Sequence, residues 1–319
     1  MQKSSPPGRA IAVINLKGGV GKTTLAVNLA AGLANRSDGT RNYSVLLVDL
    51  DSQASATSYM LGETPLDPEN NIQHILAQWM AGKQPVVLPE NITGRTSARN
   101  PVFNGTWPNL HLLQAFPGLR EIEYGAYIKF ASKSDVLERK KHYSILQFVL
   151  ENARQDYDYI IFDCPPNYNW IAAGAVQMAD DLIVPVIPDF LSTNGLRDLV
   201  LTVSEDIAML SPRSGKRIRA IALMLWESNN NVYSQYIRDL REEQLTRLRN
   251  TSPHIKELLR DCEIWDGLTR RVLVQKLVQT YRAIVSEDAG QVSRSELDKM
   301  VDSILEWKRP EAENVEERG

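Results

Sequence analysis

The chain has 319 residues, of which 43% are hydrophobic and 24% charged, an ordinary balance for a globular protein in water. No run of about 18 apolar residues occurs, and residues 1–9 contain no apolar stretch, so the sequence predicts neither a membrane span nor a secretory leader. The two cysteines, Cys164 and Cys262, lack metal-ligand spacing, which argues against a zinc or iron–sulfur site and favours reduced thiols in the cytoplasm.

The net charge of −3 hides an asymmetry along the chain. Residues 211–282 hold 14 Lys/Arg against 8 Asp/Glu, whereas residues 283–319 hold 5 against 10. A basic segment therefore precedes an acidic one. Such a segment usually only solvates a surface, but it is also what a nucleic-acid contact requires, so both interpretations stay open.

Runs typical of strands recur along the chain, with patterns typical of helices between them. Several runs are almost wholly Val, Ile and Leu, as expected for strands buried on both faces of a parallel sheet. This alternation predicts an α/β doubly wound fold with a mostly parallel sheet, whose ligand binds at the carboxyl ends of the strands. The expected strands are 10–14, 44–49, 110–113, 159–163, 182–186 and 218–225, and the expected helices between them are 24–34, 142–154 and 193–210.

Residues 62–108 interrupt the alternation. Glycine, proline and asparagine crowd its second half, so we expect a short helix at 72–81 followed by a long irregular insertion. The length allows two domains, but a doubly wound sheet of this size can form one. We expect a single domain over residues 9–307, a disordered N-terminus at 1–8 and an acidic, frayed tail at 308–319.

The stretch from Asn15 to Thr24 is the most informative in the chain. It reads Asn-Leu-Lys-Gly-Gly-Val-Gly-Lys-Thr-Thr and lies between an apolar run and an amphipathic segment. A glycine-rich turn between a strand and a helix points backbone N–H groups and a helix N-terminus at one spot, which is how proteins hold phosphates. A chance glycine cluster is the alternative, but the full spacing disfavours it. We expect a nucleoside triphosphate to contact residues Lys17, Gly18, Gly19, Val20, Gly21, Lys22, Thr23 and Thr24.

This loop departs from the general pattern in an informative way. Leu16 stands where the pattern has glycine, and an additional lysine, Lys17, opens the loop. Lys17 lies too far back to share the work of Lys22, so it is better placed to reach phosphates bound by a second copy. Residues 17–23 match in full the Lys-Gly-Gly-x-Gly-Lys-[Ser/Thr] signature, and here the chain resembles the ParA/MinD family of deviant Walker A ATPases. The resemblance implies a P-loop NTPase fold and a homodimer formed with ATP.

Asp49 and Asp51 follow the apolar run at 45–48. Carboxylates at a strand end can hold Mg²⁺ through water or orient the nucleophile that attacks the γ-phosphate. The resemblance assigns water positioning to Asp51, with Lys17 and Lys22 as the other catalytic residues, and makes Asp49 a partner of the Mg²⁺ site. The family continues with Pro-Gln-Gly/Ala-Asn, whereas this chain continues Ser-Gln-Ala-Ser. As the alternative, these acids are solvated turn residues or cap the next helix.

Asp163 ends a second apolar run and is followed by Cys-Pro-Pro, as in members of the family. This is the Walker B arrangement, in which Asp163 would bind Mg²⁺ together with Thr23. Cys164 is best interpreted as a small buried residue, because no nearby histidine in the sequence could activate it as a nucleophile. Residues 181–189 also match the family's strand with paired prolines. Asn229 lies where the family contacts the base, although residues 263–267 replace its Ile-Pro-Arg-Asn loop.

The resemblance covers residues 9–60 and 109–307 and implies a ParA-like ATPase. Such a switch dimerises on ATP, binds DNA non-specifically and releases it when a ParB-like or cargo adaptor protein stimulates hydrolysis, so that a plasmid, chromosome or protein cargo is positioned. Its location would be the cytoplasm, on the nucleoid. Phosphate contacts are expected from Lys216, Arg217, Arg219, Arg270 and Arg271.

Three other function classes fit the sequence less well. A MinD-like ATPase on a membrane or scaffold needs a basic amphipathic C-terminal helix, whereas residues 292–307 lead into several glutamates that anionic lipid would repel. A nitrogenase-reductase-like electron donor needs cluster ligands that two cysteines do not supply. A nucleotide-dependent metabolic ligase would need a substrate motif, and none is evident.

Overall fold

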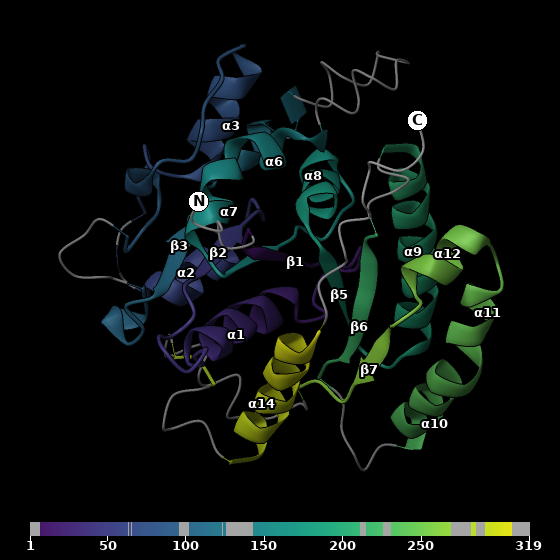
Figure 1. Ribbon diagram of the computed structural model, residues 1–319. Helices are drawn as coiled ribbons and strands as arrows, with labels where there is room; N and C mark the ends of the chain where they lie inside the picture. Colours follow the sequence, from purple (N-terminus) through teal and green to yellow (C-terminus); the bar gives the residue numbers. More distant parts are fainter. Residues whose placement is uncertain are drawn as a thin grey trace, which may run out of the picture.

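The computed structural model describes residues 7–62, 64, 66–95, 102–122, 124–125, 143–210, 215–225, 231–268, 282–284 and 291–307. Its centre is a seven-stranded sheet in the order β3-β2-β4-β1-β5-β6-β7, and every strand pair in it is parallel (Figure 1). The predicted doubly wound α/β fold is therefore confirmed. The strands are β1 (Arg9–Val13), β2 (Val45–Asp49), β3 (Leu110–Leu113), β4 (Tyr159–Asp163), β5 (Asp181–Val186), β6 (Arg217–Leu223) and β7 (Glu263–Trp265).

The sheet separates two apolar cores because side chains alternate between the faces of each strand. On β1, Ala10 and Ala12 belong to one core, together with α8 (Trp170–Met178) and α9 (Phe190–Leu210). Ile11 and Val13 belong to the other, together with α1 (Lys22–Ala34) and α14 (Gln291–Glu306). Both faces are covered, which is why the strands are apolar along their whole length rather than alternating with polar residues.

Of the helices expected from sequence periodicity, α1 and α9 form close to their expected bounds, whereas α14 was not among those expected. The expected helix at 142–154 is divided at Leu150 into α6 (Ile145–Val149) and α7 (Glu151–Asp156), and its first residue lies outside the described part. The other helices that were not expected are α2 (Ser55–Leu61), α8, α10 (Asn231–Asp239), α11 (Leu245–Arg249) and α12 (Pro253–Leu258), with a π-helical turn at Leu240–Gln244.

Residues 62–108 contain α3 (Ile72–Met80) and two 3₁₀ turns, η1 (Pro89–Asn91) and η2 (Val102–Gly105). The helix begins where the sequence indicates, because the side chain of Asn71 accepts a hydrogen bond from His74 N–H at 3.0 Å. Val87 and Ile92 are buried in the core beside α8 and α9, so parts of this irregular stretch also contribute to the packing. Among the helices of the described residues, none combines the length and the apolar character that a bilayer crossing requires.

Candidate nucleotide site

The glycine-rich loop joins β1, between β4 and β5 in the sheet, to α1. Gly19 and Gly21 have φ angles of 74° and 87°, the left-handed region that only glycine adopts without strain. Gly21 is also the N-cap of α1 and supplies no side-chain cap to the first helical N–H groups. A loop that turns back in this way, followed by an uncapped helix N-terminus, is an anion-binding cradle.

The two signature lysines lie at opposite ends of this loop and are held differently. Lys22 is largely buried, and its Nζ donates to the Lys17 carbonyl at 2.9 Å, which closes the loop on itself. Burial lowers the pKa of Lys22, while the nearby carboxylates of Asp163 and Asp51 and the thiol of Cys164 raise it. Lys17 is about one-third exposed, and its Nζ lies 3.3 Å from both carboxylate oxygens of Asp189. Lys22 thus faces into the site and Lys17 opens outward.

Asn15 fixes the start of the loop, a role that the sequence analysis did not assign. Its side-chain amide donates to the Pro185 carbonyl at 2.7 Å, and its Oδ1 accepts from Lys17 N–H at 2.9 Å. Pro185 belongs to β5, the neighbour of β1, so the loop is tied to the adjacent strand. The paired-proline run of β5 was the sequence signal for this contact.

The two predicted Mg²⁺ carboxylates end adjacent strands in register, with Asp49 opposite Asp163. Both side chains are fully buried. Asp49 is well satisfied: its Oδ2 accepts from the N–H and the hydroxyl of Thr57, both at 2.8 Å. Neither oxygen of Asp163 has a hydrogen-bond partner within the described part of the chain. A buried carboxylate that makes no hydrogen bond in the described residues, with only the Thr23 hydroxyl as a nearby donor, marks a place where a cation fits.

Burial raises the pKa of both carboxyl groups; the negative charge of Asp49 raises that of Asp163 further, and the charge of Asp51 adds to both. For Asp163 the nearby Thr23 hydroxyl and the Lys22 ammonium lower the pKa, but they do not offset the burial. Thr23, Lys22 and Asp163 are thus brought together, as the sequence predicted. A divalent cation would stabilise the ionised form of both acids, so the residues present fit Mg²⁺ beside a bound triphosphate.

Asp51 lies on the turn just beyond Asp49. Its N–H donates to Asp49 Oδ1 at 3.1 Å, and its own Oδ1 accepts from Gln53 N–H at 2.9 Å. The side chain is half-buried and close enough to influence the charges of Lys22 and Asp163. Its assigned role in orienting water stays a prediction. Cys164 is fully buried, as expected, and burial raises the pKa of its thiol.

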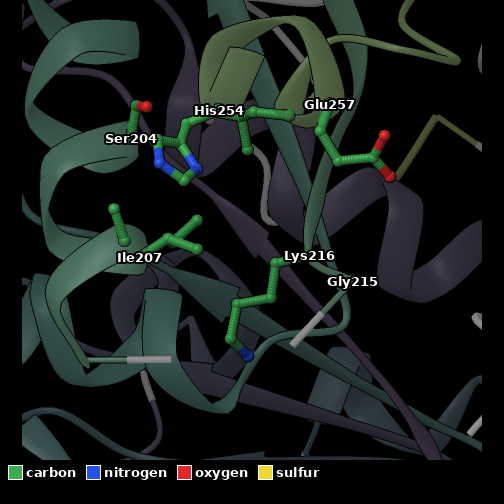
Figure 2. Close-up of a pocket in the computed structure, with 8 residues that line it drawn as sticks. Ser204, Ile207, Gly215, Lys216, His254 and Glu257 are labelled. Carbon is green, nitrogen blue, oxygen red and sulfur yellow. The ribbon is translucent and has the colours of Figure 1, made fainter. Parts of the chain in front are cut away.

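The expectation that Lys216 forms part of an exposed basic patch is wrong. It lies just before β6, at the sheet edge opposite the nucleotide loop, and its stem lines a pocket with His254, Ser204 and Glu257 (Figure 2). Its Nζ donates to the Gln177 and Ala179 carbonyls at 2.6 and 2.7 Å, and burial lowers its pKa to about 8. Lys216 therefore caps the C-terminus of α8.

Arg217 and Arg219 are not free for DNA either. Arg217 forms ion pairs with Asp261 and Glu257. Arg219 is only 8% exposed, lies 3.7 Å from Asp181 and 3.3 Å from Asp261, and has its guanidinium 5.1 Å from the centre of the Trp307 ring. Both guanidinium groups are therefore paired with acidic side chains of the same chain. The remaining predicted contacts, Asn229 for the base and Arg270 and Arg271 for DNA, lie outside the described residues.

Comparisons with known proteins agree with this geometry. A family model described as an AAA domain matches residues 8–212. The chromosome partitioning protein ParA of Caulobacter vibrioides is 30% identical over 242 residues, which is 75% of this chain and 77% of that protein. The sporulation initiation inhibitor protein Soj of Bacillus subtilis is 31% identical over 235 residues, or 74% and 79%.

The chain belongs to the ParA/MinD family of P-loop ATPases. Solved structures share the fold of this ParA-like protein. The ATP complex of a McdA variant from Cyanothece has a TM-score of 0.68 at 16% identity and covers 96% of this chain and 99% of its own. Cobyrinic acid a,c-diamide synthase of Mycobacterium smegmatis, with an ATP analogue and magnesium, has a TM-score of 0.63 at 21% identity and covers 93% and 94%. At these identities the likeness concerns the fold alone.

Asp163→Asn should stabilise the nucleotide-free ParA-like protein while removing its ATPase activity. The raised pKa means that the folded state binds protons more tightly than the unfolded chain, so the stability of the wild type falls as pH rises above about 4, where the unfolded carboxylates ionise. The variant escapes this loss and should unfold with a free energy about 1 kcal/mol higher at pH 7. Thermal unfolding between pH 4 and 8 measures the difference.

Asp158→Asn is the matched control for this substitution. Its carboxylate pairs with Arg41 at 2.6 Å and accepts from Ser44 N–H, and these contacts lower its pKa, so the asparagine should destabilise the protein at pH 7. An Asp163→Asn protein that is no more stable than the wild type at pH 7 would contradict the view that the buried, ionised Asp163 carboxylate destabilises the folded protein.

Proposed function

We propose that this ParA-like ATPase is a positioning switch. It dimerises on ATP and Mg²⁺, binds DNA non-specifically in that state, and hydrolyses ATP to segregate or position a plasmid, chromosome or protein cargo. A ParB-like or cargo adaptor protein stimulates hydrolysis and so releases the DNA. The names of the partitioning relatives support the positioning role, and the site's residues support the nucleotide cycle.

The observation that carries the proposal is that the two loop lysines differ in burial and in the groups they contact. Lys22 is buried at the base of the loop beside Asp163, where a β- or γ-phosphate would replace the Lys17 carbonyl as its acceptor. Lys17 is exposed at the mouth of the loop and contacts Asp189. In the proposed dimer, Lys17 exchanges that carboxylate for a phosphate bound by the partner. Dimerisation then depends on ATP.

The remaining roles follow from position. Bound Mg²⁺ would neutralise phosphate charge, and Thr23 and Asp163 would hold it, with Asp49 as the neighbour fixed by Thr57. Asp51 would orient the attacking water. Backbone N–H groups of residues 18–24 would hold the phosphates. Asn229 stays the proposed base contact.

DNA binding is proposed for residues Arg270 and Arg271 only, because Lys216, Arg217 and Arg219 are used inside the protein. Leu268, two residues before Arg270 in the sequence, lies near the carboxyl end of β6, because the Leu225 N–H just past that strand donates to the Leu268 carbonyl at 2.8 Å. A dimer would present two such arginine pairs and thereby double the phosphate contacts.

Duplex DNA on beads tests the proposal. The wild type should bind with ATP and Mg²⁺ and not without them, and affinity should fall with salt, since each neutralised phosphate adds about 0.9 to the slope of log K against log[salt]. Arg270→Glu combined with Arg271→Glu should abolish binding while sedimentation still shows an ATP-dependent dimer. Lys17→Ala is the control that should stay monomeric. Equal binding by all three proteins at low salt would refute the proposed surface.

A further inference from the structure

A buried asparagine connects the nucleotide-binding helix to a distant part of the chain. Asn28 lies in the second turn of α1, is fully buried, and donates its side-chain amide to the Thr24 carbonyl at 2.8 Å. Its Oδ1 accepts from Ile284 N–H at 2.7 Å. Thr24 directly follows the phosphate loop, so one side chain ties the start of α1 to the 282–284 segment.

A second hydrogen bond joins the same segment to α2. Tyr59 of α2 donates its hydroxyl to the Arg282 carbonyl at 2.9 Å and is itself buried. The same helix contains Thr57, whose N–H and hydroxyl hold the carboxylate of Asp49. α2 therefore contacts both Asp49, through Thr57, and Arg282, through Tyr59. A shift of α2 would move both contacts.

The 282–284 segment is thus hydrogen-bonded to both helices that begin beside the candidate nucleotide site. α1 begins at the phosphate loop, and α2 follows the turn that carries Asp51. Ala283 and Ile284 are buried in the same core as both helices. Because the core is closely packed, a shift of either helix should displace these two residues. In sequence, the segment comes directly after residues 269–281, which contain Arg270 and Arg271.

We propose that Asn28 and Tyr59 are positioning residues through which the nucleotide state controls the 282–284 segment. The inference rests on the proposed function, because it says how the binding of ATP would be transmitted from the nucleotide site to another part of the chain. Hydrogen bonds to a buried backbone N–H and carbonyl have two discrete states, made or broken, which is what a coupling element requires.

Hydrogen exchange followed by mass spectrometry on the full chain tests this directly, without DNA. In the wild type, ATP and Mg²⁺ should slow exchange both in peptides of the phosphate loop, residues 15–24, and in peptides covering 282–284. Tyr59→Phe keeps the ring and removes only the hydroxyl, and Asn28→Ala removes the acceptor of Ile284 N–H. Each should speed exchange of the 282–284 segment by about tenfold, the factor that one lost hydrogen bond is worth. In both variants ATP should still protect residues 15–24 but no longer protect 282–284.

Arg36→Ala is the matched control. Arg36, just past the end of α1, pairs with Asp298 and Asp302 of α14 at 2.9 and 3.0 Å. Its loss should loosen α1 but leave the hydrogen bonds of Asn28 and Tyr59 to the 282–284 segment intact. This variant should keep the ATP response at 282–284. A wild-type response in Tyr59→Phe, or protection of 15–24 without any change at 282–284 in the wild type, would overturn the inference alone. Failure of ATP to protect 15–24 in the wild type would overturn the proposed function and the inference together.

Discussion

Lys22→Ala should lose most ATP binding at an ATP concentration that half-saturates the wild type. The Lys22 ammonium is the one loop cation buried against Asp163, and it would be the fixed positive charge on the β- and γ-phosphates. A charge-assisted contact to a buried partner contributes about 1.5–3 kcal/mol, so its removal should weaken binding by roughly 10- to 150-fold. Titration with a fluorescent ATP analogue measures the loss.

The control for this experiment is Lys83→Ala, which removes an exposed lysine beyond the end of α3 and should leave affinity unchanged. Circular dichroism should show both variants folded. Wild-type affinity in a folded Lys22→Ala protein would mean that the loop does not hold the phosphates through this residue.

Asp51→Ala should bind ATP and Mg²⁺ normally yet hydrolyse it at least about 100-fold more slowly, because it loses the group that orients the attacking water and keeps every phosphate contact. The ATP-bound dimer should therefore accumulate, and sedimentation should find it hours after ATP is added. Released phosphate gives the rate.

Asp51→Asn separates chemistry from structure at this position. An asparagine can still accept the Gln53 N–H at the same oxygen, so it preserves the turn while it removes the charge. If the residue serves only the turn, the asparagine should restore hydrolysis and the alanine should not. If it orients water, both should be slow. Hydrolysis near the wild-type rate in Asp51→Ala would move the role to Asp49.

The sequence alone predicted the sheet and the nucleotide loop because both are encoded locally. Strands buried on both faces must be apolar throughout, so the runs at β1, β2 and β4 stand out without any knowledge of their neighbours. The loop at 15–24 needs glycine at left-handed positions and a lysine at the helix start, and these residue types have fixed spacing. The acids at the strand ends were predictable because each directly follows an apolar run. The carboxyl ends of parallel strands lie at one edge of the sheet, so these acids were expected near the loop.

Short or uniformly buried elements were missed where that local pattern is absent. α8 is buried on every side, so it shows no helical periodicity. The residue before α2, Ala54, has a φ of 51° and gives the helix no side-chain cap. β7 has only three residues, Glu263 to Trp265, and is a strand because it pairs with β6. Pairing of this kind is decided by tertiary contact.

The charges are where the sequence and the structure disagree most. Counting residues 211–282 as basic is correct, yet the count does not say which charges face water. Lys216 caps α8, and Arg219 lies between Asp181 and Trp307, contacts that join positions 37 and more residues apart. Likewise, nothing local to Asn28 indicates that it holds Ile284, 256 residues away. Sequence fixes the type and spacing of the groups within a motif, whereas the partner of each buried polar group is chosen only when the folded chain brings distant segments within hydrogen-bond distance.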